Sequence, residues 1–374
     1  MWPIAIKTLV SDRGKLLTAL VGVVFSIVLV NVQGGLFVGL IRKAGLLVDH
    51  GNADIWVGHK LMHNVDFPSD IPRHLCDRIR TTPGVRNAEP YLLGFADMAL
   101  PSGGFEQVLV VGVDPKSMIG GAWNLVEGAP DGILQADGII LDRSENEKLE
   151  YPVLGDVREL NGRRARVVGF TQGIRGFLVT PYAFTTYDRA AEYVQKNSAT
   201  SSYFLLQLEP GYDAETVCES VRQRVPELDV FPRDTYSNIS ISYWMTRTGL
   251  GISFGAATLL GLFVGLVMVA ETLYALVLDR LGEFGTLKAI GATERQVFSI
   301  LFLQAISMAI VGSLIGLLLV GFIQRFCNTP KTPIVVPWWV SLGSCLLVLV
   351  ICLVAAILPY VRIRKVDPMM VLQS

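Results

Sequence analysis

Three histidines lie close together in one short stretch of the sequence, and two of them have a spacing that could suit metal ligands. His59 and His63 are four residues apart, and His50 precedes them. On a helix, that spacing would place both imidazoles on one face, where they could ligate a metal or haem iron. The simpler interpretation is a solvated loop. The sequence therefore predicts no resident metal or cofactor, and His59 and His63 are the weak candidates for one.

Carboxylates are the next residues that could do chemistry. Glu145 and Glu147 lie in the charged run DRSENEKLE, which is most simply a solvated helix face rather than a catalytic pair. The sequence contains no G-x-x-x-x-G-K-[ST] loop, no G-x-S-x-G elbow and no H-E-x-x-H motif. We therefore expect a non-catalytic chain, and any ATP hydrolysis would belong to a partner.

Composition indicates a protein that spans a membrane. Hydrophobic residues make up 51% of the chain and charged residues 17%, against about 25% charged in soluble domains. The apolar residues concentrate in 16–41 and 249–358, whereas 42–247 has an ordinary soluble composition. The net charge of −1 argues against a nucleic-acid partner. Five scattered cysteines without C-x-x-C spacing fit neither a zinc site nor a disulfide framework.

Four apolar segments are long enough to cross a bilayer, which takes roughly 20 residues. They are residues 16–41, 248–278, 297–323 and 338–358. The first is too long for a signal peptide and has no A-x-A cleavage site after it, so we interpret it as a retained anchor. The fold class expected is a membrane protein with four transmembrane helices and a large extracytoplasmic domain inserted between helices 1 and 2.

Basic residues in the short segments predict the orientation, because cytoplasmic segments are enriched in Lys and Arg. The N-terminal tail, the 279–296 segment and the C-terminal tail each carry three such residues in or beside them, and the 324–337 loop carries two. We therefore expect both termini and 279–296 in the cytoplasm, with 42–247 and 324–337 outside. The basic residues are Lys7, Arg13, Lys15, Arg280, Lys288, Arg295, Arg362, Arg364 and Lys365 inside, and Arg325 and Lys331 outside.

The inserted segment, 42–247, has the pattern of an α+β domain. Short runs rich in β-branched and aromatic residues predict strands, and two amphipathic runs predict helices. The expected strands are Ala53–Val57, Gln107–Val113, Gly138–Leu141, Ala165–Phe170 and Tyr203–Leu208, and the expected helices are Ile71–Thr81 and Ala214–Arg224.

Two kinds of residue stand out within the apolar segments. Gly261 and Gly265 form a G-x-x-x-G pair that lets helices approach closely, within the chain or across a dimer. Glu271 is a carboxylate in an apolar run, where charge is costly and often functional. The alternative is that Glu271 lies within two turns of the interface and reaches water.

The 279–296 segment is short and amphipathic. Leu281, Phe284 and Leu287 recur at helical spacing among charged residues. Such an apolar stripe suits docking into a groove of a partner. A chain that lacks its own ATP-hydrolysing motif could dock in this way onto a chain that has one.

The run Glu283–Thr293, EFGTLKAIGAT, closely resembles the cytoplasmic loop of FtsX/MacB-type ABC transporter permeases, especially the DevC-like branch. The resemblance extends over essentially the whole chain. Residues 1–15 look like the amphipathic elbow helix of the family, 42–247 like its periplasmic core domain, and 359–374 like its cytoplasmic tail. The residues that the resemblance assigns to ATPase docking are Leu281, Glu283, Phe284, Leu287, Lys288 and Gly291.

The resemblance implies the permease subunit of an exporter in the bacterial inner membrane. Two copies would pair, and two cytoplasmic ATPase subunits would bind their coupling loops and drive the outer domain by mechanotransmission. The cargo would be lipophilic: a lipid, glycolipid, haem or drug, with a periplasmic membrane-fusion adaptor as a possible partner. The alternatives are a non-transporting mechanotransmitter that regulates an extracytoplasmic enzyme or lipoprotein, and an anchor without an ATPase. Gln304 and Glu271 depart from residues common in the family, which makes a relative's substrate hard to transfer.

Overall fold

The computed structural model describes residues 13–178, 180–279, 292–327, 334–357 and 360. The chain divides into two compact units. One contains residues 1–39 and 250–374, and we call it the membrane unit. The other contains residues 40–249, and we call it the outer unit. Each is described by itself.

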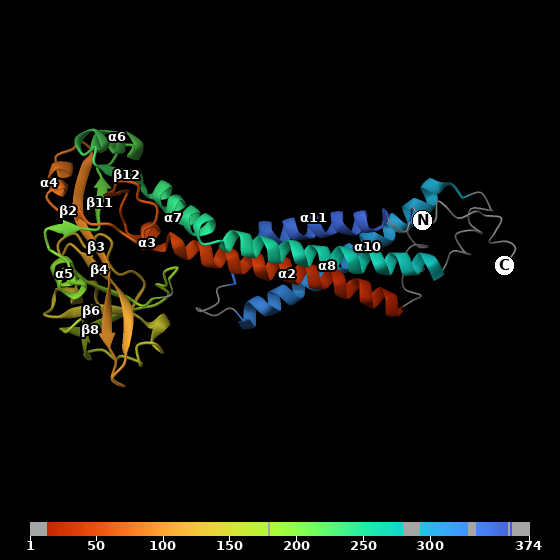
Figure 1. Cartoon of the computed structure of the whole chain (residues 1–374), viewed down its shortest axis with the longest axis horizontal. Helices are drawn as coiled ribbons and strands as arrows, with labels where there is room; N and C mark the ends of the chain where they lie inside the picture. Colours follow the sequence, from red (N-terminus) through yellow and green to blue (C-terminus); the bar gives the residue numbers. More distant parts are fainter. Residues whose placement is uncertain (1–12, 179, 280–291, 328–333, 358–359, 361–374) are drawn as a thin grey trace. The chain divides into compact units, whose positions relative to one another are not determined.

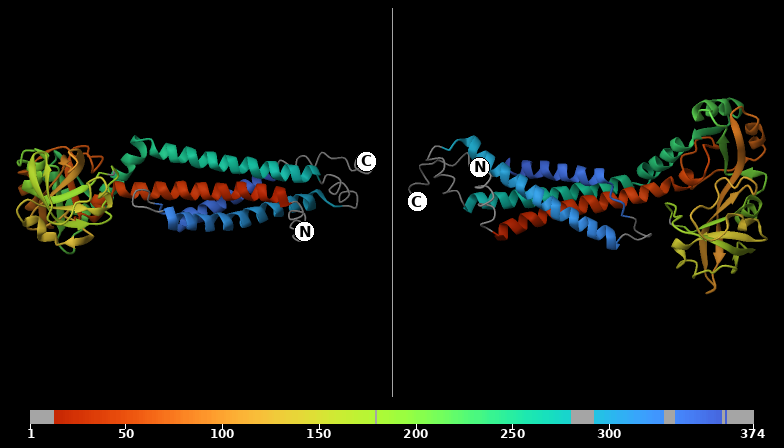
Figure 2. Two further views of the ribbon diagram at one scale, coloured as in Figure 1. Left: turned by 90° about the horizontal axis from the view of Figure 1, so that it is seen from below. Right: turned by 180° about the vertical axis from the view of Figure 1, so that it is seen from behind.

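The membrane unit is built from long apolar helices. Among the described residues, four helices are long and apolar enough to cross a membrane. They are α2 (Arg13–Ile41), α8 (Leu250–Asp279), α10 (Glu294–Cys327) and α11 (Trp338–Ala355). Figure 2 shows α2 and α8 running side by side. The large domain lies between the first and second of these helices, so the expected fold class is confirmed.

The outer unit is organised around a ten-stranded mixed sheet with the order β12-β1-β11-β3-β4-β9-β6-β8-β5, in which β7 pairs with β3 and β8. The pairs β4–β9 and β6–β8 are parallel, and the other pairs are antiparallel. A separate two-stranded sheet joins β10 and β2. The strands are β1 (Ile55–His59), β2 (Ile71–Pro72), β3 (Val85–Ala99), β4 (Phe105–Val113), β5 (Leu125–Gly128), β6 (Gly138–Asp142), β7 (Val157–Leu160), β8 (Arg163–Thr171), β9 (Tyr182–Thr186), β10 (Thr200–Ser201), β11 (Tyr203–Leu208) and β12 (Leu228–Pro232).

Helices cover parts of this sheet (Figure 1). The apolar residues of α4 and α6 share one core cluster with β1, β11 and β12, and those of α5 share another with β3, β4 and β6. The α-helices of the outer unit are α3 (Leu46–His50), α4 (Leu75–Arg80), α5 (Tyr187–Val194), α6 (Ala214–Arg224) and α7 (Arg233–Arg247), with 3₁₀ turns η1 (Arg42–Ala44), η2 (Pro130–Leu134) and η3 (Arg143–Glu145).

The five expected strands all exist, as β1, β4, β6, β8 and β11. The expected helix Ala214–Arg224 is α6, with Asp213 as its N-cap. The expected helix Ile71–Thr81 is only partly correct. Its first two residues form β2, and the helix α4 begins at Leu75. Pro72 explains the difference, because proline disfavours helical geometry in the residue before it.

Candidate functional site

The predicted ATPase-docking residues lie outside the described residues. Leu281, Glu283, Phe284, Leu287, Lys288 and Gly291 all fall within 280–291, and the expected elbow helix falls mostly within 1–12. Their assignment therefore stays a prediction. The described part of the chain resumes at Ala292, and α10 begins two residues later.

The glycine pair of α8 packs against α2 of the same chain. A Cβ built on Gly265 would lie 1.9 Å from Ser26 Oγ, and one on Gly261 would lie 2.4 Å from Leu29 Cδ2. The hydroxyl of Ser26 donates a hydrogen bond of 3.1 Å to the carbonyl of Gly261. These contacts describe the approach of α8 to α2 within one chain; a role of the glycine pair across a dimer stays a prediction.

One polar side chain of α2 is buried among the membrane helices. Asn31 on α2 is fully buried and donates from Nδ2 to Ser344 Oγ on α11 at 2.7 Å. Its Oδ1 accepts a 3.0 Å hydrogen bond from Ser341. Because hydrogen bonds between side chains join membrane helices, Asn31 fixes α11 to α2.

The two other intramembrane polar residues have different environments. Gln304 on α10 is buried, whereas Glu271 is exposed on the surface of α8. Within the described residues, Glu271 has no hydrogen-bond or ion-pair partner.

The histidine pair does not lie on a helix. His59 is the last residue of β1, and residues 60–63 form a turn and irregular chain. The imidazole of His59 is hydrogen-bonded to the Lys60 carbonyl at 2.6 Å. The helical condition for a shared metal is not met, and no group of three or more His, Cys, Asp or Glu residues suited to a metal occurs in the described parts of the chain.

The last helix of the outer unit, α7, leads directly into α8. Its buried residues are Tyr236, Ser237, Ser240 and Trp244, which recur at helical spacing. The Tyr236 hydroxyl donates to the Tyr203 hydroxyl at 3.2 Å, which ties α7 to β11 of the sheet. Only Thr248 and Gly249 separate the end of α7 from the start of α8.

Trp244 near the end of α7 is held by two loops. The indole Nε1 donates to Asp66 Oδ2 at 3.1 Å, and the Phe177 ring stacks on the indole at a centroid distance of 4.0 Å. The Val65 amide in the first loop donates to Ser240 Oγ at 3.1 Å. We call residues 60–67, residues 172–178 and Trp244 the α7 clamp.

Burial changes the pKa of one carboxyl group in the α7 clamp. Asp66 is 2% exposed, and desolvation raises its pKa from 3.8 to about 7, although the hydrogen bond from Trp244 opposes this shift. At neutral pH the carboxyl is thus divided between its protonated and charged forms. Its charged form accepts the indole hydrogen bond more strongly.

A buried polar network shapes the second loop of the clamp. Asp142 at the end of β6 accepts hydrogen bonds of 2.9 Å from Thr171 Oγ1 and from the Ile174 amide. Arg175 forms an ion pair with Glu145, and both side chains are at most 3% exposed. The expectation of a solvated face was therefore wrong for Glu145, because η3 turns this carboxylate inward, whereas Glu147 is exposed. The network fixes the backbone that carries Phe177.

Two family models cover most of the chain. Residues 16–224 match the MacB-like periplasmic core domain, and residues 255–368 match the FtsX-like permease C-terminal domain. The fold and these matches define a membrane permease with a large extracytoplasmic domain. The chain belongs to the FtsX/MacB-type ABC transporter permeases, as the sequence predicted; the DevC-like branch stays a prediction.

Individual relatives are distant. The uncharacterised ABC transporter permease YknZ of Bacillus subtilis is 23% identical over 62% of this chain and 60% of its own length. The uncharacterised permease Rv0072 of Mycobacterium tuberculosis is 26% identical over 58% and 57%. A putative hemin transport system permease, HrtB of Staphylococcus haemolyticus, is 26% identical over 27% and 29%. The chain thus spans about three-fifths, or less, of the length of these relatives.

Solved structures resemble about half of this chain at low identity. The periplasmic region of MacB from Actinobacillus actinomycetemcomitans has a TM-score of 0.40 and 11% identity, over 50% of this chain and 92% of its own. The extracellular domain of YknZ from Gram-positive bacteria has a TM-score of 0.36 and 12% identity, over 48% and 98%.

Proposed function

We propose that this chain is the permease subunit of an ABC-type exporter that uses ATP hydrolysed by a separate cytoplasmic subunit. Membership of the permease family supports this proposal, together with the four membrane helices. The cargo we propose is lipophilic, and two copies of the chain with two ATPase subunits would form the transporter. Glu271, exposed on a single copy, would then face the second copy or an inner cavity.

The observation that carries the coupling proposal is the attachment of α7. This helix is fastened to the sheet by Tyr236 and to two loops by Trp244. Because α8 follows after two residues, a movement of α8 has a short covalent route into the outer unit. Mechanotransmission from the 279–296 segment through α8 and α7 is the mechanism that this connection supports.

Docking of the ATPase is tested by Phe284→Asp in the 279–296 segment. A charge in place of an apolar anchor should weaken the complex by about 2 kcal/mol or more, so that the ATPase no longer co-purifies. Phe105→Asp is the control, because Phe105 is an exposed phenylalanine of the outer unit. Equal recovery of the ATPase with Phe284→Asp and with the control would rule out this docking site.

The orientation that we propose places both termini in the cytoplasm of a bacterium and 42–247 outside its inner membrane. In a background without the five native cysteines, an impermeant thiol reagent should label Ser102→Cys on intact spheroplasts. It should label Thr293→Cys only after lysis. Labelling of Thr293→Cys alone on intact spheroplasts would reverse the orientation.

Export and regulation make different predictions for bound molecules. An exporter purified with native lipids should retain a lipophilic compound that mass spectrometry detects and that ATP turnover releases. A mechanotransmitter that moves no solute would show ATP turnover without such release and would co-purify with an extracytoplasmic enzyme or lipoprotein. An adaptor recovered together with the released compound would favour export.

A further inference from the structure

The strand β7 has an inverted pattern of burial. Its residues alternate between the two faces, as strands do, but Val157 is 48% exposed whereas Arg158 is 8% exposed. The next inward residue, Leu160, belongs to the apolar core. An arginine thus occupies a position where the fold would otherwise bury an apolar side chain.

Arg158 is incompletely paired. Its Nη2 lies 3.4 Å from Asp156 Oδ2, a long contact to a carboxylate that also accepts the Val153 amide at 3.1 Å. Its Nη1 is shielded from water and has no hydrogen-bond partner among the described residues. A buried donor without a partner is unfavourable by about 1–3 kcal/mol, and more when it is charged. Such a group calls for an explanation beyond packing.

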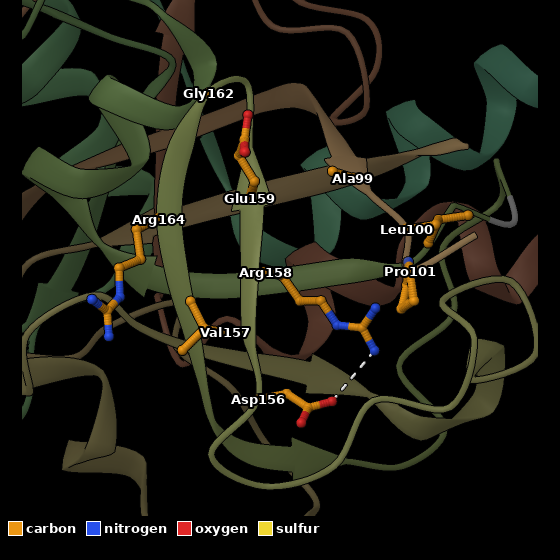
Figure 3. Close-up of a pocket in the computed structure, with 9 residues that line it drawn as sticks. All are labelled: Ala99, Leu100, Pro101, Asp156, Val157, Arg158, Glu159, Gly162 and Arg164. Atoms are coloured by element: carbon orange, nitrogen blue, oxygen red, sulfur yellow. Dashed lines mark hydrogen bonds and ion pairs between the residues drawn. The ribbon is translucent and has the colours of Figure 1, made fainter. Parts of the chain in front are cut away.

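A cavity of about 610 Å³ lies beside this guanidinium. Figure 3 shows Arg158 extending toward Leu100 and Pro101 at the end of the β3–β4 hairpin. The wall is partly apolar, and its charged side chains are two basic and two acidic ones. The lining residues are Ala99, Leu100, Pro101, Asp156, Val157, Arg158, Glu159, Gly162 and Arg164.

The lining selects the charge and shape of a ligand. Arg164 already contacts Asp137 at 3.5 Å, so Arg158 is the cation of the lining with an unpartnered donor. Asp156 and Glu159 would repel a ligand with two negative charges, whereas one carboxylate would balance the unpartnered donor of Arg158. The carbons of Leu100, Pro101 and Val157 suit an apolar body next to that group.

We propose that this cavity binds a small amphiphile with a single carboxylate, which accepts a hydrogen bond from Arg158. The site is separate from the α7 clamp and does not depend on the proposed export function. Arg158 holds its charge in a position that a stable core alone would give to an apolar residue. The ligand site would then explain why β7 buries Arg158 and exposes Val157.

The proposal is tested by photolabelling the full chain in lipid nanodiscs with a short aliphatic carboxylate that carries a diazirine. The corresponding alcohol is the neutral probe. The carboxylate should label peptides that contain 99–101 or 156–164, and Arg158→Met should reduce this labelling at least about tenfold. Arg163→Met is the matched control, because Arg163 is exposed on the neighbouring strand and does not line the cavity.

Stability separates a binding role of Arg158 from a structural one. If Arg158 serves a ligand, Arg158→Met should leave the unfolding temperature of the ligand-free protein unchanged or higher, because an incompletely paired buried charge is removed. A lowered unfolding temperature would contradict the proposal. Excess hexanoate should suppress wild-type labelling while hexanol does not, and this comparison needs no variant.

Two results would overturn the proposal. One is equal labelling of the cavity by the carboxylate and the alcohol, which would show an apolar pocket without selection for charge. The other is absence of labelling by the carboxylate probe together with crosslinking of the cavity to an acidic peptide segment. That outcome would assign Arg158 to a protein partner.

Discussion

At the residue scale, the main contacts of the α7 clamp are made by Trp244 and Asp66. The indole is in contact with both loops, and the carboxyl accepts its hydrogen bond. Burial raises the pKa of Tyr182, Tyr203 and Tyr236, and the negative charge of Asp66 adds to each of these shifts. Ionisation of Asp66 itself is unfavourable in the folded protein because its carboxyl is desolvated.

The raised pKa of Asp66 predicts a pH dependence of stability. The pKa is 3.8 in the unfolded chain and about 7 in the folded one, so the folded protein holds this proton more tightly between these values. Stability from this group is full below about pH 4 and is lost as pH rises through about 7, by up to roughly 4 kcal/mol.

The substitution Asp66→Asn should remove this dependence. The free energy of unfolding, measured by denaturant titration with tryptophan fluorescence, should fall less between pH 5 and pH 8 in the variant than in the wild type. This pH window covers about two-thirds of the range over which folding changes proton binding at Asp66. Asp131→Asn, at an exposed position, is the control. Identical pH profiles for wild type and Asp66→Asn would contradict the raised pKa.

At this scale, sequence patterns singled out some of the relevant residues and missed others. Glu271 and the glycine pair are visible because a charge or a small-residue spacing stands out in an apolar run. Glu145 and Arg158 are not visible, because their burial depends on a short 3₁₀ turn and on which face of β7 meets the core. The alternation in VREL contains the signal for Arg158, with its charge on the same face as Leu160.

At the element scale, α8 and α2 approach closely at Gly265 and Ser26. The substitution Gly265→Ala should destabilise the membrane unit by roughly 1–3 kcal/mol, because the added methyl overlaps the Ser26 side chain. Gly255→Ala is the matched control on the same helix, since a Cβ there meets nothing within 4 Å.

Thermal unfolding in detergent measures this difference. Gly265→Ala should unfold at a lower temperature than Gly255→Ala, and the additional change Ser26→Gly should recover part of the loss. Equal unfolding temperatures for the two alanine variants would show that α2 and α8 do not pack through Gly265.

Among the elements of the outer unit that the sequence-based prediction did not include, β3 and α7 have a physical reason for their absence. The strand β3 contains Pro90 and Gly94, which weaken the pattern of a strand. The helix α7 is rich in Ser, Thr and Asn, which have low helix propensity. Its buried residues Tyr236, Ser240 and Trp244 nevertheless recur every four residues, and this periodicity was the available signal.

At the scale of the whole molecule, composition was sufficient to predict a membrane protein. It was insufficient to predict the contacts that attach α7 to the outer unit. Long apolar runs predict membrane helices because bilayer thickness sets their length. The docking motif predicts an ATPase partner from residues 280–291, which lie outside the described part of the chain. The clamp was not predictable, because its three parts come from positions near 66, 177 and 244 and meet only through tertiary folding.

The central claim is that ATP turnover changes the outer unit through α8 and α7. The most direct test is hydrogen exchange of residues 60–67 and 172–178 in the complex with its ATPase, with and without ATP and vanadate. In the wild type, nucleotide should change the exchange of both loops. In Trp244→Ala the change should be lost while the ATPase remains bound. Exchange that is insensitive to nucleotide in the wild type, or equally sensitive in Trp244→Ala, would contradict the account.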